Sequence, residues 1–143
     1  MKTIRLLMAL GFIIPLLSCN SQASKNEVKE ATASSDKIEA YYFHFTARCI
    51  TCRTIEARAK ENLESLYPNQ VKQGLISFQS LNLEEAANKA LAETLGVSGQ
   101  ALLLVKGDQK INLTNEGFMY AVAKPDKFRE IINEKVDGLL LSK

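Results

Sequence analysis

The run "ALLLVK" at Ala101–Lys106 constrains the fold more than any other stretch of this 143-residue chain. Continuous apolar character is typical of a strand that is buried on both faces of a sheet. Gly107-Asp108 follows directly and predicts a turn into another strand, Lys110–Leu113. Because so short a turn joins only antiparallel strands, the run predicts a covered sheet that contains a hairpin.

Two more strands are expected before this hairpin. "KIEAYYFHF" (Lys37–Phe45) is short and rich in aromatic residues, which favour strands. "LISFQSLNL" (Leu75–Leu83) alternates apolar and polar residues in places. A segment with helical periodicity follows each of them, so the first half of the domain predicts parallel strands with helical crossovers.

Three segments have apolar residues at helical spacing. The first begins at Cys52 and is ended by Pro68, and the second, Glu84–Leu95, is stopped by Gly96 at the C-cap position. The third spans Pro125–Leu140, and its proline suits a first helical turn. The side chains expected to face the core are Ile55, Ala59, Leu63 and Leu66, then Ala87, Leu91 and Leu95, then Phe128, Ile131, Ile132, Val136 and Leu139.

The predicted order of elements is therefore β-α-β-α-β-β-α. Parallel strands and an antiparallel hairpin share one sheet in this order, so the sheet is expected to be mixed and four-stranded. Helices on its faces make the fold class a three-layer α/β sandwich. The domain is expected to cover residues 37–143, which is enough for one compact core.

The N-terminal residues 1–18 predict a secretory signal. Lys2 and Arg5 precede the apolar run Leu6–Leu17, which is too short to span a membrane comfortably. "LLSC", ending at Cys19, resembles the lipobox of bacterial lipoproteins, which implies cleavage before Cys19 and its lipidation, with palmitate among the acyl chains. The alternative is an ordinary signal that happens to end in cysteine. We expect an exported protein, anchored by lipid on the periplasmic side of the cell envelope.

Residues 19–36 are expected to form the lipidated N-terminus and a flexible tether. Val28 is the only strongly apolar residue of Ser21–Asp36, so this segment cannot bury enough surface to offset its ordering entropy. Lys and Arg number 18 in the whole chain against 16 Asp and Glu, and no basic block stands out. This balance gives no footprint of nucleic-acid binding.

Cys49 and Cys52 stand where the first predicted strand gives way to the first helix. Free backbone N–H groups and the helix dipole stabilise a thiolate there, and Arg48 and Arg53 would add to this. We therefore predict a lowered pKa and an attacking role for Cys49, whereas Cys52 would resolve the mixed disulfide. A structural disulfide and half of a zinc site remain alternatives, although the chain has no second cysteine pair and only one histidine, His44.

Other residues near the pair are candidates for the site. His44 is either a proton shuttle or third ligand to a thiol-bound ion, or a packed histidine with a hydrogen bond. Thr46 is expected to cap the coming turn or to contact a sulfur or substrate. Arg48 is either a contact for an anionic substrate or a solvated arginine. Tyr41 and Tyr42 are expected to pack in the sheet.

"FTARCITC" after a strand and "LGVSGQALLLVKGD" at the third strand resemble the thioredoxin-like superfamily over Lys37–Lys143. More narrowly, "YYFHFTARCITCRTIE" resembles the ArsF family, whose members are named as subunits of a nitrophenyl-compound nitroreductase and occur in arsenic-resistance operons. The resemblance implies a part in reducing aromatic nitro groups of organoarsenicals, with other nitroreductase subunits as partners. The chain shows no flavin or nicotinamide fingerprint, so no cofactor is expected in it.

The sequence departs from the thioredoxin pattern around the cysteines. Arg48 stands where thioredoxins have a tryptophan, and Ile50-Thr51 stands where they have Gly-Pro. Phe43 takes the position of their buried carboxylate, and Ala101 or Gln100 takes that of their cis-proline. The reduction potential of the thioredoxin cysteine pair therefore cannot be assumed for Cys49 and Cys52. A cis bond before a non-proline residue costs about 2.5–4 kcal/mol, so this loop is expected to be all trans. Gln100 and Ala101 are then candidates for contact with a substrate or partner.

These observations favour one function and leave a second open. The first is a thiol-disulfide oxidoreductase or nitroreductase subunit, in which Cys49 and Cys52 relay electrons to a redox partner protein. The second is a binding module that holds Cu(I) or As(III) through both sulfurs, with His44 as a further ligand. An inert disulfide in a scaffold lipoprotein is a third interpretation.

Overall fold

The computed structural model describes residues 36–142. The strands are β1 (Ile38–His44), β2 (Ile76–Asn82), β3 (Ala101–Lys106) and β4 (Gln109–Asn112), and the helices are α1 (Ile50–Leu66), α2 (Pro68–Lys72), α3 (Ala86–Thr94), α4 (Thr114–Tyr120) and α5 (Pro125–Leu141). The predicted signal, the lipidation site at Cys19 and nearly all of the tether lie outside the described residues. No helix within residues 36–142 is long and apolar enough to cross a membrane.

The strands form one mixed sheet in the order β2-β1-β3-β4. β1 runs parallel to β2, from the pair Ile38 and Ile76 onward, and antiparallel to β3, where Phe43 pairs with Ala101. β3 and β4 form the predicted hairpin, and Gly107 takes the positive φ of 54° that its tight turn requires. The predicted fold class is therefore confirmed.

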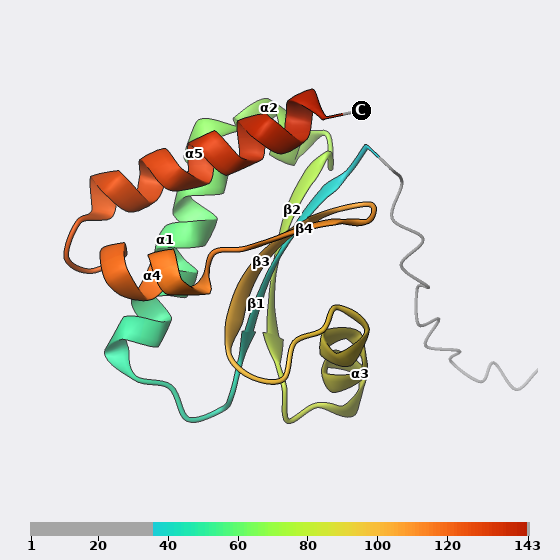
Figure 1. Ribbon diagram of the computed structural model, residues 1–143. Coiled ribbons are helices and arrows are strands. Elements are labelled where there is room, and N and C mark those ends of the chain that lie inside the picture. The colour runs from blue at the N-terminus through green and yellow to red at the C-terminus, as the bar shows by residue number, and fades with distance from the viewer. Residues whose placement is uncertain (1–35, 143) are drawn as a thin grey trace, which may run out of the picture. The chain divides into compact units, whose positions relative to one another are not determined.

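Helices cover the two faces of the sheet and make three layers (Figure 1). α1, α4 and α5 lie on one face, and α3 lies on the other. The alternation along β1 divides its side chains between the two faces, because Tyr42 joins the core under α1 and α5 while Tyr41 and Phe43 join the core under α3. β3 is buried along its whole length, as its continuous apolar run predicted.

Lys106 is the one charged residue in β3, and it is buried at the end of the strand. Its ammonium Nζ donates to the carbonyl of Leu139 at 2.8 Å and to that of Ser142 at 2.6 Å. These oxygens belong to the last turn of α5 and the residue after it, where helix carbonyls lack internal partners. Lys106 therefore holds the end of α5 on the sheet.

Two short helices were not predicted. Pro68 ends α1 as expected but also begins α2, because proline fits a first helical turn. α4 follows β4 and packs on α1 through Gly117, at which an added Cβ would lie 2.9 Å from Cγ2 of Ile55. In α3 the prediction of Ala87 as a core residue was wrong. The helix meets the sheet through a stripe that includes Ala92, and Ala87 is exposed near its first turn.

Candidate functional site

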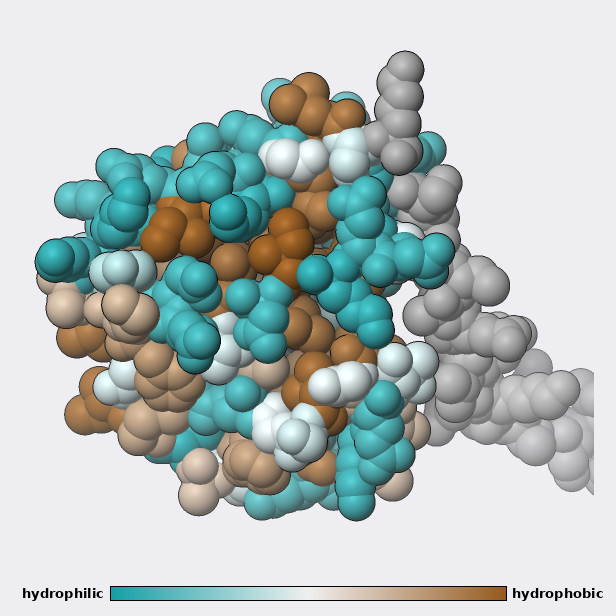
Figure 2. Space-filling model, viewed as in Figure 1, coloured by the Kyte–Doolittle hydropathy of each residue, from teal (hydrophilic) through white to brown (hydrophobic). Residues whose placement is uncertain are grey.

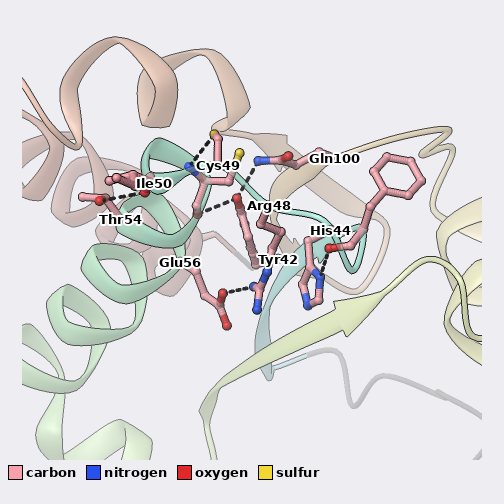
Figure 3. Close-up of polar contacts among 10 residues, drawn as sticks. Tyr42, His44, Arg48, Cys49, Ile50, Thr54, Glu56 and Gln100 are labelled. Atoms are coloured by element: carbon pink, nitrogen blue, oxygen red, sulfur yellow. Dashed lines mark hydrogen bonds and ion pairs between the residues drawn. The ribbon is translucent and has the colours of Figure 1, made fainter.

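Cys49 lies beyond the C-terminal end of the inner strand β1, directly before α1 (Figure 3), and Cys52 lies in the first turn of α1. Cys49 is the N-cap of α1, with extended backbone, and its sulfur accepts the backbone N–H of Cys52 at 3.2 Å. Cys49 is exposed, whereas Cys52 is only 7% exposed, and both are free thiols. The Cys49 sulfur is thus accessible to a partner molecule, whereas the Cys52 sulfur is buried one helical turn further along the chain.

The environment of Cys52 favours its ionised form. Burial raises the pKa of this thiol, but hydrogen bonds from Cys49, from Gln100 and from the backbone outweigh burial and leave the pKa lowered. The attacking role of Cys49 stays a prediction, and its exposure and N-cap position are what a nucleophile needs.

Tyr42 is a site residue that sequence reasoning placed only in the packing of the sheet. Its side chain is 1% exposed, and its hydroxyl donates to the carbonyl oxygen of Cys52 at 2.7 Å. The amide Nε2 of Gln100 donates to the same hydroxyl at 2.6 Å (Figure 3). Burial raises the pKa of Tyr42, so the hydroxyl stays neutral and remains a donor. Strand β1, helix α1 and the loop before β3 thus meet at this hydroxyl.

An ungapped comparison with thioredoxins placed Phe43 at the position of their buried carboxylate and so implied that it lies beside Cys52. The structure does not place it there. Its ring is fully buried on the opposite face of the sheet, in the cluster that contains Ala101 and Leu103. Successive side chains of a strand point to opposite faces, so the residue of β1 beside Cys52 is Tyr42. The lack of a carboxylate at position 43 therefore does not determine which groups lie beside the Cys52 thiol.

His44 is almost buried at the end of β1, and its Nδ1–H donates to the carbonyl of Phe45 at 2.9 Å. Within residues 36–142, no three Cys, His, Asp or Glu side chains are grouped as metal ligands. His44 therefore does not complete a three-ligand site with Cys49 and Cys52. The alternative of a packed, hydrogen-bonded histidine matches this geometry, and its role as a proton shuttle stays a prediction.

The guanidinium of Arg48 forms an ion pair with the carboxylate of Glu56 in the second turn of α1, and each side chain is 24% exposed. An anionic substrate would have to compete with this carboxylate. Contact of Arg48 with a substrate or partner protein stays a prediction, and in the structure its guanidinium is paired with Glu56. Arg53 is exposed on the first turns of α1.

Thr46 does not cap α1, since Cys49 holds the N-cap position. Its hydroxyl donates instead to the carboxylate of Glu84 and accepts the side-chain N–H of Asn82 at 2.8 Å. Asn82 is the last residue of β2, and Glu84 lies in the connection from β2 to α3. Thr46 therefore fastens the loop that carries Cys49 to a neighbouring loop at the same edge of the sheet.

The loop before β3 contains no cis bond, as predicted, since the described residues have only trans peptide bonds. It forms one side of an open groove of about 520 Å³, whose other side consists of Asn112 at the end of β4 and the first residues of α4. Gln100 lines this groove and reaches Tyr42, while Ala101 is 5% exposed at the start of β3. Gln100 therefore links an accessible groove to the buried surroundings of Cys52.

Apolar side chains are exposed near the cysteine pair. Ile50, directly after Cys49, is 83% exposed. Phe118 and Met119 of α4 and Val122, in the turn after this helix, are also exposed to solvent. Figure 2 shows apolar residues gathered at the lower left, over α4 and the start of α1. The exposed thiol thus has an apolar surface close to it.

No protein-family model matches the chain, and no match was found among curated proteins. Solved structures do match. Thioredoxin O2 from Arabidopsis thaliana, in its oxidized state, has 18% sequence identity and a TM-score of 0.50, with 71% of this chain and 77% of that chain covered. Thioredoxin f2 from Chlamydomonas reinhardtii has 20% identity and a TM-score of 0.41 over 70% of this chain and 80% of that chain. At such identity the likeness to thioredoxin O2 shows the fold, which is thioredoxin-like.

Proposed function

We propose that this protein is a thiol-disulfide relay, in which Cys49 and Cys52 exchange two electrons with a partner protein. The observation that carries the proposal is the arrangement of the pair. An exposed sulfur occupies the N-cap of a helix, and a buried sulfur with a lowered pKa lies one turn inward. A purely structural disulfide does not require that one of its two sulfurs be exposed to solvent.

The relay has two steps that balance. The Cys49 thiolate attacks a disulfide of the partner, so that a mixed disulfide forms and one partner sulfur leaves as a thiolate. The Cys52 thiolate then attacks the Cys49 sulfur, the Cys49–Cys52 disulfide forms, and the second partner sulfur leaves with its electron pair and takes a proton from water. The partner's disulfide is reduced to two thiols, and the chain is oxidised by two electrons. The steps run in reverse when the partner is the donor.

The finer proposal concerns the place of this relay. The lipobox-like "LLSC" ending at Cys19 supports a lipid-anchored protein of the cell envelope. The likeness of residues around Cys49 to the ArsF family supports a role beside a nitroreductase of nitrophenyl or organoarsenical compounds. Reduction of a nitro group to an amine needs six electrons, so a two-electron pair would serve as a relay subunit of such a system.

Trapping tests the proposal. Cys52→Ser should hold the partner as a stable mixed disulfide on Cys49, because nothing resolves it, and Cys49→Ser should trap far less, because its remaining sulfur is buried. Both variants would be expressed in the native cell and compared on non-reducing gels with mass spectrometry. Equal trapping by the two variants, or trapping by neither, would contradict the relay.

A further inference from the structure

A side chain near Cys52 can stabilise the thiolate form of this cysteine when it attacks the mixed disulfide. This inference rests on the function proposed above. A thiolate buried away from water is costly unless hydrogen bonds stabilise it. Within residues 36–142, no carboxylate and no imidazole forms a hydrogen bond with the Cys52 sulfur. A hydrogen-bond donor, and not a base, must therefore favour the charged form.

Gln100 is the side chain that meets this need. The hydroxyl of Tyr42 donates its proton to the carbonyl of Cys52 at 2.7 Å, so its oxygen is left to accept. The amide of Gln100 consequently presents its NH2 group to that oxygen, at 2.6 Å. An amide NH2 has two donors, and the second is available to the sulfur of Cys52, whose ionised form Gln100 stabilises.

The placement of this amide is fixed on several sides. Tyr42 is fully packed in the core under α1, which leaves its hydroxyl no freedom to move away. The carbonyl that it contacts belongs to Cys52 itself, so Tyr42 of β1 is hydrogen-bonded to the residue that carries the thiol. Gln100 lies in the residues just before β3, whose first residue pairs with β1. Hydrogen bonds thus run from Gln100 to Tyr42 and from Tyr42 to the backbone of Cys52, the residue that carries the inner sulfur.

We propose that Gln100 is a catalytic residue of the resolving step, in which its amide, positioned by Tyr42, donates to the Cys52 thiolate as this sulfur attacks the mixed disulfide. The sulfur–sulfur bond to Cys49 forms, the bond from Cys49 to the partner breaks, and the partner's thiolate departs with the electron pair. Gln100 gives up no proton in this step. Tyr42 acts through Gln100 and is a positioning residue.

Other titratable groups near Cys52 come from the elements packed around it. Cys49 lies at the N-cap of α1, and Tyr42 contacts the Cys52 carbonyl from β1. Arg48 and Glu56 form an ion pair with each other and act on Tyr42 with opposite signs. In the mixed disulfide Cys49 no longer titrates. The pH dependence of the resolving step therefore reports on Cys52 directly.

The test uses the full-length chain with Cys19→Ser, so that only Cys49 and Cys52 carry thiols. The reduced protein is mixed with 5,5′-dithiobis(2-nitrobenzoate), and the released thionitrobenzoate is followed by absorbance. The first release marks attack on the reagent, which forms a mixed disulfide on Cys49. The second release marks attack by Cys52, and its rate is measured as a function of pH.

Removal of the donor should disfavour the thiolate. A hydrogen bond to a charged group is strong enough that Gln100→Ala should raise the pH midpoint of the second phase by about 1 unit. At pH values below both midpoints the second phase should slow about tenfold, because the thiolate fraction falls by that factor. Gln100→Glu should raise the midpoint further, since a carboxylate repels a thiolate. Tyr42→Phe should give a smaller rise.

The control is Gln109→Ala, which removes an exposed glutamine from β4 at the far end of the hairpin and should leave both phases unchanged. A second-phase midpoint that stays the same or falls in both Gln100→Ala and Gln100→Glu would overturn the inference. If the parent protein shows no second release at all, the relay itself fails. The two failures are thus distinguishable.

Discussion

Gly117 offers a sharp test of the packing that supports the site. It lies in α4 and is buried against α1, and a Cβ added to it would lie 2.9 Å from Cγ2 of Ile55. Carbon atoms do not approach so closely, so Gly117→Ala must push α4 away from α1 or shift Ile55. Ile55 is in the turn of α1 that follows Cys52, so a shift there would reach the cysteine pair.

The magnitude follows from two opposing effects. Alanine is favoured over glycine in a helix by about 0.8–1 kcal/mol. Overpacking of a tight contact costs about 1–3 kcal/mol. We therefore expect Gly117→Ala to lower the free energy of unfolding by up to about 2 kcal/mol. Gly138 is the matched control, because it lies in α5, is exposed, and has nothing within 4 Å of an added Cβ. Gly138→Ala should raise the free energy of unfolding by about 0.5–1 kcal/mol.

Urea unfolding followed by circular dichroism measures both variants, with unchanged slopes required for the comparison. Ile55→Leu removes the branch at Cβ that carries Cγ2, so the cost of Gly117→Ala should shrink in the double variant and show coupling between the two sites. If Gly117→Ala stabilised the protein as much as Gly138→Ala does, the close packing of α4 on α1 would be refuted.

Three further predictions concern single side chains. Lys106→Met should lower the free energy of unfolding by about 1–3 kcal/mol and speed hydrogen exchange at the end of α5, because the last carbonyls lose a charged donor. Unchanged exchange there would contradict it. Burial, with help from Asp137, raises the pKa of Tyr67, so the neutral tyrosine stabilises the fold below about pH 10 and this contribution is lost as the pH rises further. Tyr67→Phe should therefore lose less stability than the parent between about pH 8 and pH 11 in urea titrations. Iodoacetamide should modify Cys49 faster than Cys52 in peptide mass spectra, and the reverse order would contradict the assigned exposure.

The sequence allowed the fold class and most element bounds to be predicted within a residue or two, because local patterns carry that information. Apolar periodicity marks α1 and α5, and the continuous run marks β3. α2 and α4 escaped because each is short and lacks an apolar stripe. The proline that opens α2 was interpreted only as the end of the preceding helix.

The candidate site was predicted in part. Cys49 and Cys52 could be placed at a helix N-terminus because the strand and the helix flank them directly in the chain. Tyr42 and Gln100 are 58 positions apart, and nothing local indicates that their side chains meet beside Cys52. The buried Lys106 escaped for the same reason, since its partners lie in the last turn of a distant helix. Contacts of this kind depend on how the elements pack, which periodicity does not encode.

The central claim is that Cys49 and Cys52 form a working redox pair. The full-length chain with Cys19→Ser would be equilibrated in graded thiol–disulfide buffers, its free thiols trapped by alkylation, and the products counted by mass spectrometry. A reduction potential between about −120 and −270 mV is the value that a relay predicts. A potential below about −300 mV would mean a structural disulfide and would contradict the claim.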